Sequence, residues 1–234
     1  MTTATVVGST GLVGSQILNQ LLSIAKVSTV TTLTRRPSPH AIADPTSKLK
    51  ATINSDSSAW ATLIPATSTF FSALGTTRAD AGSLAAQRAI DYDLNLSLAK
   101  AAKERGVNTY VLISSAGANA KSWTPYSAMK GQLEEEVAAL GFEKCVILRP
   151  GLIVGAREKA RWIEQPLHAF ANLLGGVRAG LKDVWAQDAE TIARAAIRAG
   201  VEEEVWNGRK MVEGKNGGKV WTMGQAEIVE LGKL

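Results

Sequence analysis

The sequence predicts an α/β fold, a doubly wound parallel sheet with helices on both faces and a small mixed C-terminal portion. Three observations support this prediction. Apolar runs rich in β-branched residues alternate with segments of helical periodicity along the first 150 residues. A glycine-rich turn, GSTGLVG at residues 8–14, directly follows the first apolar run. Strands that are separated by helices form parallel βαβ units with right-handed crossovers.

The alternation defines each expected element. The runs that predict strands are residues 4–7, 27–34, 50–54, 69–74, 108–114 and 144–148. The periodic segments that predict helices are residues 12–24, about 83–105, 126–140 and 190–199. Gly106 and Gly141 are typical C-terminal caps for two of these helices. Residues 35–48 are rich in proline and serine and predict a loop.

Composition excludes several classes of protein. The chain has 234 residues, of which 45% are hydrophobic, and its only cysteine, Cys145, permits no internal disulfide. With two histidines, we expect no metal site. The net charge of +5 is scattered, which argues against a nucleic-acid partner. No apolar run reaches the length of about 18 residues that a membrane span needs, and the early first strand leaves no room for a signal peptide.

The glycine-rich turn lies where the first strand meets the first helix. There Gly8 permits a tight turn, Gly11 lets the backbone approach a pyrophosphate, and Gly14 lets the helix pack on the strand. The positive end of the helix faces the phosphates. This pattern predicts a Rossmann-type dinucleotide site, although a turn that serves packing alone remains the alternative.

The next strands refine this prediction. Arg35 and Arg36 follow the second strand, where an arginine accommodates the 2′-phosphate of NADP and an acidic residue binds the ribose of NAD. Two ordinary surface arginines are the alternative interpretation. Leu74 and Gly75 end the fourth strand, beside the expected adenosine, where only a small residue leaves room. We therefore expect NADP(H) as the cofactor.

A possible catalytic set follows the fifth strand. Tyr126 and Lys130 are four residues apart and so share one helical face, and Ser114 and Ser115 end the preceding strand. A nearby positive charge lowers the pKa of a tyrosine, and a seryl hydroxyl can hold a carbonyl oxygen. Either serine can take this role. A chance Tyr-x-x-x-Lys on a surface helix is the alternative.

Together these motifs resemble the short-chain dehydrogenase/reductase superfamily, in its atypical or extended branch. The segments TLTRRP, ALGTTRADAG, LISSAGANA, YSAMKGQLEEEV and ILRPGLIVGAR resemble the Tat-interacting protein family of NADPH-binding reductase-like proteins. The fungal branch of that family is associated with the mitochondrial outer membrane. The resemblance covers nearly the whole chain and is weakest from about residue 156 to 220.

The resemblance implies roles for individual residues. Residues 10–13, which include Thr10, Leu12 and Val13, would lie on the pyrophosphate, and Pro150 to Leu152 would border the nicotinamide. Tyr126 would exchange the proton while Lys130 binds ribose and lowers the pKa of Tyr126. Asn95 would hold Lys130 through a water, or else lie with Asp91 and Asp93 on an exposed helix face. Residues 132–137, QLEEEV, are expected to form a solvated face.

These inferences give two candidate functions. The first is an NADPH-dependent oxidoreductase that reduces a small carbonyl substrate in a single domain, residues 1–234, with residues from about 151 onward on the substrate side. The second is a non-catalytic NADPH-binding protein that senses redox state and binds a protein partner. The resemblance implies a cytoplasmic protein, associated peripherally with the cytosolic face of the mitochondrial outer membrane. The oligomeric state stays open.

Overall fold

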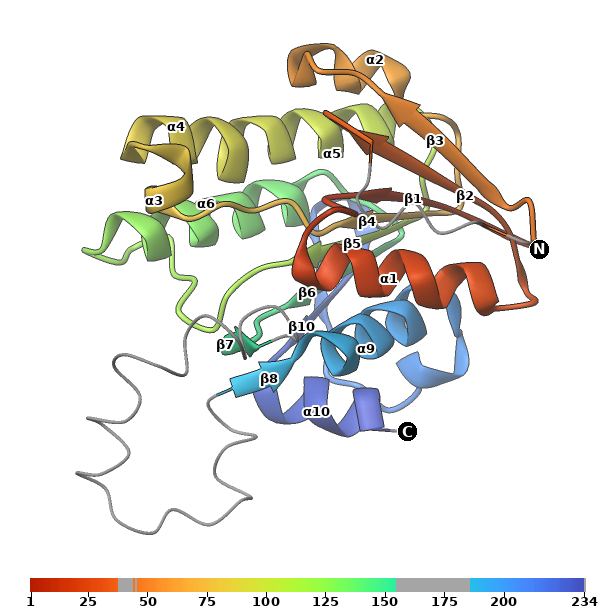
Figure 1. Ribbon diagram of the computed structural model, residues 1–234. Coiled ribbons are helices and arrows are strands. Elements are labelled where there is room, and N and C mark those ends of the chain that lie inside the picture. Colours follow the sequence, from red (N-terminus) through yellow and green to blue (C-terminus); the bar gives the residue numbers. More distant parts are fainter. Residues whose placement is uncertain (38–43, 45, 155–185, 234) are drawn as a thin grey trace, which may run out of the picture.

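An eight-stranded sheet forms the centre of the protein, in the order β3-β2-β1-β4-β5-β6-β10-β9 (Figure 1). The computed structural model describes residues 1–37, 44, 46–154 and 186–233. The strands are β1 (Thr2–Val7), β2 (Val27–Thr34), β3 (Leu49–Ile53), β4 (Thr69–Ser72), β5 (Thr109–Ile113), β6 (Lys144–Leu148), β9 (Val212–Glu213) and β10 (Lys219–Met223). A separate parallel pair consists of β7 (Leu152–Val154) and β8 (Ala186–Asp188). Within the main sheet, only β9 and β10 pair antiparallel.

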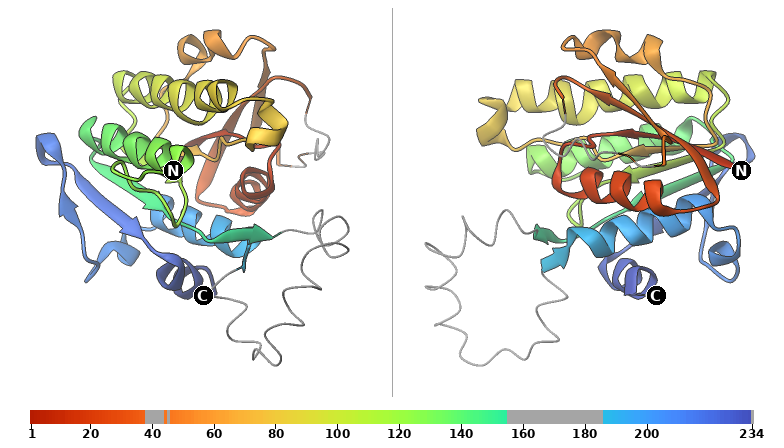
Figure 2. Two further views of the ribbon diagram at one scale, coloured as in Figure 1. Left: turned by 90° about the vertical axis from the view of Figure 1, so that its left-hand side faces the viewer. Right: turned by 45° about the vertical axis from the view of Figure 1, so that its right-hand side comes forward.

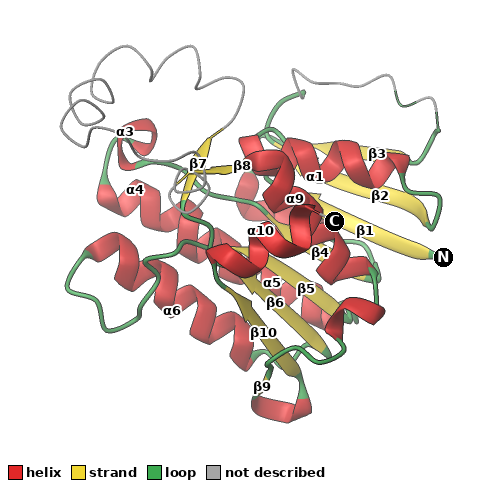
Figure 3. Ribbon diagram, turned by 90° about the horizontal axis from the view of Figure 1, so that it is seen from below, coloured by secondary structure: helices red, strands yellow, loops and turns green. Residues whose placement is uncertain are grey.

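Helices cover both faces of this sheet. In chain order they are α1 (Leu12–Ser23), α2 (Trp60–Leu63), α3 (Arg78–Ala81), α4 (Leu84–Arg88), α5 (Asn95–Glu104), α6 (Pro125–Ala139), α9 (Ala189–Val201) and α10 (Gln225–Lys233). A π-helical turn, Ala89–Leu94, joins α4 to α5. Figure 3 shows α1, α9 and α10 in front of one face of the sheet, while α4, α5 and α6 lie on the other face (Figure 2).

Alternation along the central strands supplies each helical layer with a hydrophobic partner. Phe71 and Val111 belong to the cluster that contains α1, α9 and α10. Their neighbours Phe70 and Tyr110 belong to the cluster on the opposite face, where their rings stack. Successive strand residues point to opposite faces, so both sides of the sheet are buried. This confirms the predicted α/β class.

The strand order places a crevice between β1 and β4. The chain runs from β1 outward to β2 and β3 and then returns to β4 on the other side of β1. The chain that leaves β1 enters α1 on one face of the sheet, and the chain that leaves β4 enters α4 and α5 on the other face. Open α/β sheets bind ligands in the crevice at such a switch point. Val7 pairs with Ser72, so Gly8 and Ala73 begin the two loops side by side at this edge.

All six predicted strands occur, with ends shifted by a few residues. The sequence-based prediction missed α2, α3, the π-helical turn, β7 to β10 and α10. The C-terminal part therefore contributes more to the core than expected, since β10 pairs with β6 and its Trp221 is fully buried. Residues 38–43 and 45 of the predicted loop lie outside the described residues. Within the described ranges, no helix is both long and apolar enough to cross a membrane.

The solvated face predicted for residues 132–137 is wrong in part, because Leu133, Glu134 and Val137 of this stretch are buried. Glu134 in α6 is only 4% exposed, because the helix turns it toward β5 and β6. Arg149 donates to its two carboxylate oxygens from Nε at 3.2 and 3.1 Å, and the Ser114 hydroxyl also donates to it. Its neighbours Glu135 and Glu136 are exposed, as expected.

We predict that Glu134→Gln destabilises the protein and that Glu135→Gln does not. The first change leaves Arg149 and Ser114 without their charged acceptor, which costs about 1–3 kcal/mol. The second alters a solvated side chain and stays within about 0.5 kcal/mol. Urea denaturation of both variants measures the difference. Equal unfolding free energies would show that the buried carboxylate contributes nothing to stability.

Candidate active site

The glycine-rich turn is shaped by two very close backbone contacts. Gly8 has a φ of +77°, and a Cβ there would lie 2.3 Å from the Ala73 carbonyl oxygen. A Cβ on Gly14 would lie 2.1 Å from the Gly8 carbonyl oxygen. Packing therefore requires both of these glycines. Gly11 is different, since it is exposed and its nearest contact would be at 3.3 Å, so its lack of a side chain leaves the mouth of the turn open.

Unsatisfied polar groups gather at the same turn. Helix α1 has no side-chain cap, and its first backbone hydrogen bond runs from Ser15 N–H to the Gly11 oxygen. The preceding N–H groups, which include those of Leu12 and Val13, have no acceptor within the helix. The buried Ser9 hydroxyl has no partner in the described part of the chain. These donors suit an anion, and a pyrophosphate fits them.

A cavity of about 180 Å³ opens in front of this turn. Residues 8–11, 33–36 and 73–76 form most of its wall. These three segments include seven predicted cofactor residues, namely Gly8, Thr10, Gly11, Arg35, Arg36, Leu74 and Gly75. Ser57 and Trp60 also line the cavity, and no motif in the sequence identifies them, because they follow a weakly predicted strand. Pro150 and Leu152 line neither described pocket, and Leu152 lies in β7.

Tyr126 and Lys130 both project from α6 on the side of β5. Lys130 is only 3% exposed, and its ammonium donates to the Ile113 carbonyl oxygen at 3.4 Å. Burial lowers the pKa of Lys130, while the carboxylates of Asp91 and Glu134 oppose that shift. The lysine is thus part of a buried charge network and not of a surface helix.

The prediction that Asp91 lies on an exposed helix face is wrong, and the structure makes this residue part of the site. It lies in the π-helical turn, is 1% exposed, and accepts the Thr76 backbone N–H at 2.7 Å. Burial raises the pKa of Asp91, and Lys130 and the Thr76 N–H act in the opposite direction. The extra residue of a π turn shifts the phase of the helix, and π turns often occur at functional sites. Ordinary helical spacing could not have identified this side chain.

Asn95 does not lie on an exposed helix face, while its predicted contact with Lys130 through a water stays a prediction. It is fully buried, and its amide donates to the carbonyl oxygens of Leu74, Ile90 and Asp91. The Ser72 hydroxyl donates to its side-chain oxygen. None of these bonds reaches Lys130. The Ile90 and Asp91 carbonyls belong to the π turn and the Leu74 carbonyl follows β4, so Asn95 links the turn that carries Asp91 to the end of that strand.

The acidity of Tyr126 also differs from expectation. We expected Lys130 to lower its pKa, but burial raises the pKa of Tyr126, and the Asp91 carboxylate raises it further. Ser115 alone acts to lower it. The phenol, whose side chain is 41% exposed, stays protonated at neutral pH.

The structure separates the two serines. The Ser114 hydroxyl is buried and donates to Glu134, which leaves it no part in the cleft. Ser115 is half-buried and influences the pKa of Tyr126 directly. Of the two, Ser115 is the one placed to contact a carbonyl beside Tyr126.

Comparisons of sequence place the chain among fungal proteins. Residues 45–175 match the protein family described as HIM1. "Protein fmp52-1, mitochondrial" of Aspergillus terreus is 45% identical over 240 aligned residues that cover 100% of both chains. "Protein fmp-52, mitochondrial" of Neurospora crassa is 47% identical over 99% of this chain and 96% of the relative.

Solved structures with the same fold include a short chain dehydrogenase family protein from Francisella tularensis. It has a TM-score of 0.64 and 15% identity over 97% of this chain and 98% of that chain. The enzyme WbmH of Bordetella bronchiseptica, solved in complex with NAD⁺, has a TM-score of 0.64 and 17% identity over 95% of this chain and 75% of that one. At such identity the likeness shows the fold and no more.

We predict that Asn95→Ala destabilises the protein by about 1–3 kcal/mol, because several buried carbonyls and the Ser72 hydroxyl lose their partner. Asp93→Ala, on the exposed side of the same π turn, is the matched control and stays within about 0.5 kcal/mol. Thermal and urea unfolding measure both variants. Two variants of equal stability would mean that the π turn holds itself without the amide.

Proposed function

The chain is a member of the HIM1 and fmp52 family, and from this membership and the site we propose that it is an NADPH-dependent oxidoreductase that reduces a small carbonyl substrate. The observation that carries the proposal is the placement of Tyr126 above the buried Lys130, in a pocket that shares Thr76 with the cavity of the glycine-rich turn. A proton donor and a dinucleotide cradle thus lie at one edge of the sheet.

The residues at the switch point fit a dinucleotide. The open face at Gly11, the unpartnered Ser9 hydroxyl and the free N–H groups of α1 suit a pyrophosphate. Arg35 and Arg36 would hold the 2′-phosphate of NADP, since guanidinium groups bind phosphate through paired hydrogen bonds. The NAD⁺ complex of the structurally similar WbmH supports a nicotinamide nucleotide. When bound, the reduced nicotinamide supplies a hydride.

The other steps of the proposed reduction fall to four side chains of the protein. Ser115 donates a hydrogen bond to the substrate carbonyl oxygen, and Tyr126 transfers its proton to that oxygen as negative charge develops. A raised pKa suits this direction, because the phenol is protonated before the reaction. Lys130 contributes a positive charge beneath the tyrosine, and Asp91 holds the ammonium in place.

We extend the proposal to location and to a second function. The mitochondrial names of the relatives support a mitochondrial protein, and we propose peripheral attachment at the cytosolic face of the outer membrane, by the resemblance to the fungal branch of the Tat-interacting proteins. The alternative function, a non-catalytic NADPH-binding sensor that binds a protein partner, uses the same cradle and needs no proton donor. The lining of the glycine-turn cavity, which includes neither Tyr126 nor Lys130, is the observation that favours it.

We predict that Tyr126→Phe lowers the rate of carbonyl reduction by about 10²–10⁴-fold, the usual contribution of a general acid. NADPH affinity stays within about twofold of the parent, because the ring still packs. In the parent, kcat/KM stays level through neutral pH and falls only in the alkaline range, since reduction needs the protonated phenol and its pKa is raised.

Stopped-flow absorbance of NADPH with a panel of aldehydes and ketones provides the measurement. A Tyr126→Phe variant that reduces a substrate at the parental rate would disprove the role of the tyrosine. If the parent protein binds NADPH but does not oxidise it with any carbonyl compound of the panel, the result would support the sensor instead.

We predict that the double variant Arg35→Ala/Arg36→Ala binds NADPH about 10- to 100-fold more weakly than the parent, because it loses charged hydrogen bonds to the 2′-phosphate. NADH has no such phosphate and serves as the internal control, with unchanged affinity. Raised salt weakens NADPH binding more than NADH binding. Fluorescence titration at two salt concentrations measures all four affinities. Equal affinity of the parent for the two nucleotides would remove the arginines from the site.

A further inference from the structure

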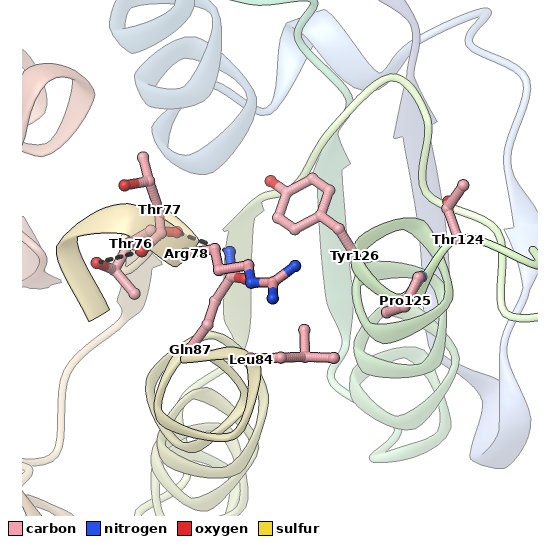
Figure 4. A pocket seen from close by; sticks show the side chains of 8 residues that line it. All are labelled: Thr76, Thr77, Arg78, Leu84, Gln87, Thr124, Pro125 and Tyr126. Carbon is pink, nitrogen blue, oxygen red and sulfur yellow. Dashed lines mark hydrogen bonds between the residues drawn. The ribbon is translucent and has the colours of Figure 1, made fainter. Parts of the chain in front are cut away.

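A second pocket, of about 420 Å³, lies beside Tyr126 (Figure 4). Its wall comes from the segment after β4, from α4 and from the start of α6, and it meets the glycine-turn cavity at Thr76. Leu84, Pro125 and the ring of Tyr126 form its apolar part. Pockets of this size hold small organic molecules. The polar groups on the wall therefore decide which molecule the pocket accepts.

Most of those polar groups already have partners. Thr77 bonds to Asp80 through its hydroxyl, Thr124 bonds to Ser122, and the Gln87 amide donates to the Thr76 carbonyl oxygen. These bonds fix the wall and leave little capacity for a ligand. They also occupy Asp80, the acidic residue nearest in sequence to the pocket's arginine.

Arg78 is the exception. Its guanidinium projects into the space between α4 and α6, which the ring of Tyr126 also borders (Figure 4). Within the described part of the chain, it makes no hydrogen bond or ion pair. Its backbone is fixed, because Arg78 begins α3 between the Thr77 cap and Gly82. Among the described residues that line the pocket, Arg78 is therefore the one cation, and all of its donors are free opposite the proposed proton donor.

We propose that Arg78 binds the carboxylate of the substrate, so that the carbonyl compound reduced here is a small oxo acid. This inference rests on the proposed function. A guanidinium forms two parallel hydrogen bonds with a carboxylate, which orients the ligand as well as attracting it. The anion at Arg78 and the carbonyl at Tyr126 are then two ends of one molecule inside one pocket.

The reaction balances with the proposed cofactor alone. The carbonyl π bond breaks as its carbon gains a hydride from NADPH and its oxygen gains the Tyr126 proton. NADPH loses two electrons and becomes NADP⁺, and the oxo acid becomes a hydroxy acid. The carboxylate at Arg78 is unchanged, and solvent returns a proton to Tyr126.

The test compares acids with neutral analogues of the same shape. Isothermal titration measures binding of 2-oxobutanoate and 4-oxopentanoate, and of their methyl esters, to the parent and to Arg78→Gln. We expect the variant to bind the acids about 10- to 100-fold more weakly and the esters within about threefold. Arg78→Lys, which keeps the charge but loses the planar fork, should fall between. Arg105→Gln, an exposed arginine at the end of α5, is the matched control.

Each outcome bears on one proposal. If the parent protein binds the acids and the esters equally, or binds neither, the proposed carboxylate site is overturned. A loss of NADPH affinity in Arg78→Gln also overturns it, because the arginine would then bind the cofactor. If the acids bind through Arg78 but no compound of the panel oxidises NADPH, the anion site stands and the reductase proposal fails. If Arg78→Gln reduces the esters normally and the acids poorly, both proposals hold.

Discussion

The charge on Lys130 is the constraint around which this site is organised. An ammonium taken out of water is costly unless it is paired and hydrogen-bonded. Two carboxylates oppose that cost, Asp91 from the π turn and Glu134 from the next turn of α6. Each carboxylate needs partners of its own, which come from the Thr76 backbone on one side and from Arg149 and Ser114 on the other. One buried lysine thus connects the ends of β4, β5 and β6.

The sequence predicted the parts of this arrangement that depend on local pattern. Alternating strands and helices, the three glycines and the Tyr-x-x-x-Lys spacing all specify structure within a few residues of themselves, so they could be read directly. The partners of Lys130 could not. Glu134 is one of three consecutive glutamates, and only the packing of α6 decides which of them is buried. Asp91 faces inward because the π turn inserts one residue into the helical repeat. The residue types around Asp91 do not indicate that the helical phase changes there.

The fold depends on local patterns of this kind, whereas the function depends on individual side chains. Structures only 15–17% identical share this fold, because burying both faces of a parallel sheet requires little more than apolar residues at the right period. The acidic partner of the lysine, the Ser9 hydroxyl and the Arg78 guanidinium, the last two without a partner among the described residues, belong to side chains that the fold does not require. Function in this protein therefore has to be argued from those side chains and not from its architecture.

The place of α3 has a consequence for how the protein can diversify. This short helix is closed by a threonine at one end and a left-handed glycine at the other, and none of its residues belongs to either hydrophobic cluster. Of its residues Arg78 lines the pocket, so replacing this side chain changes the lining and disturbs almost nothing that holds the sheet together. A duplicated gene can therefore acquire a preference for another molecule through a few substitutions in α3, while it inherits the glycine turn, the lysine network and a stable fold unaltered.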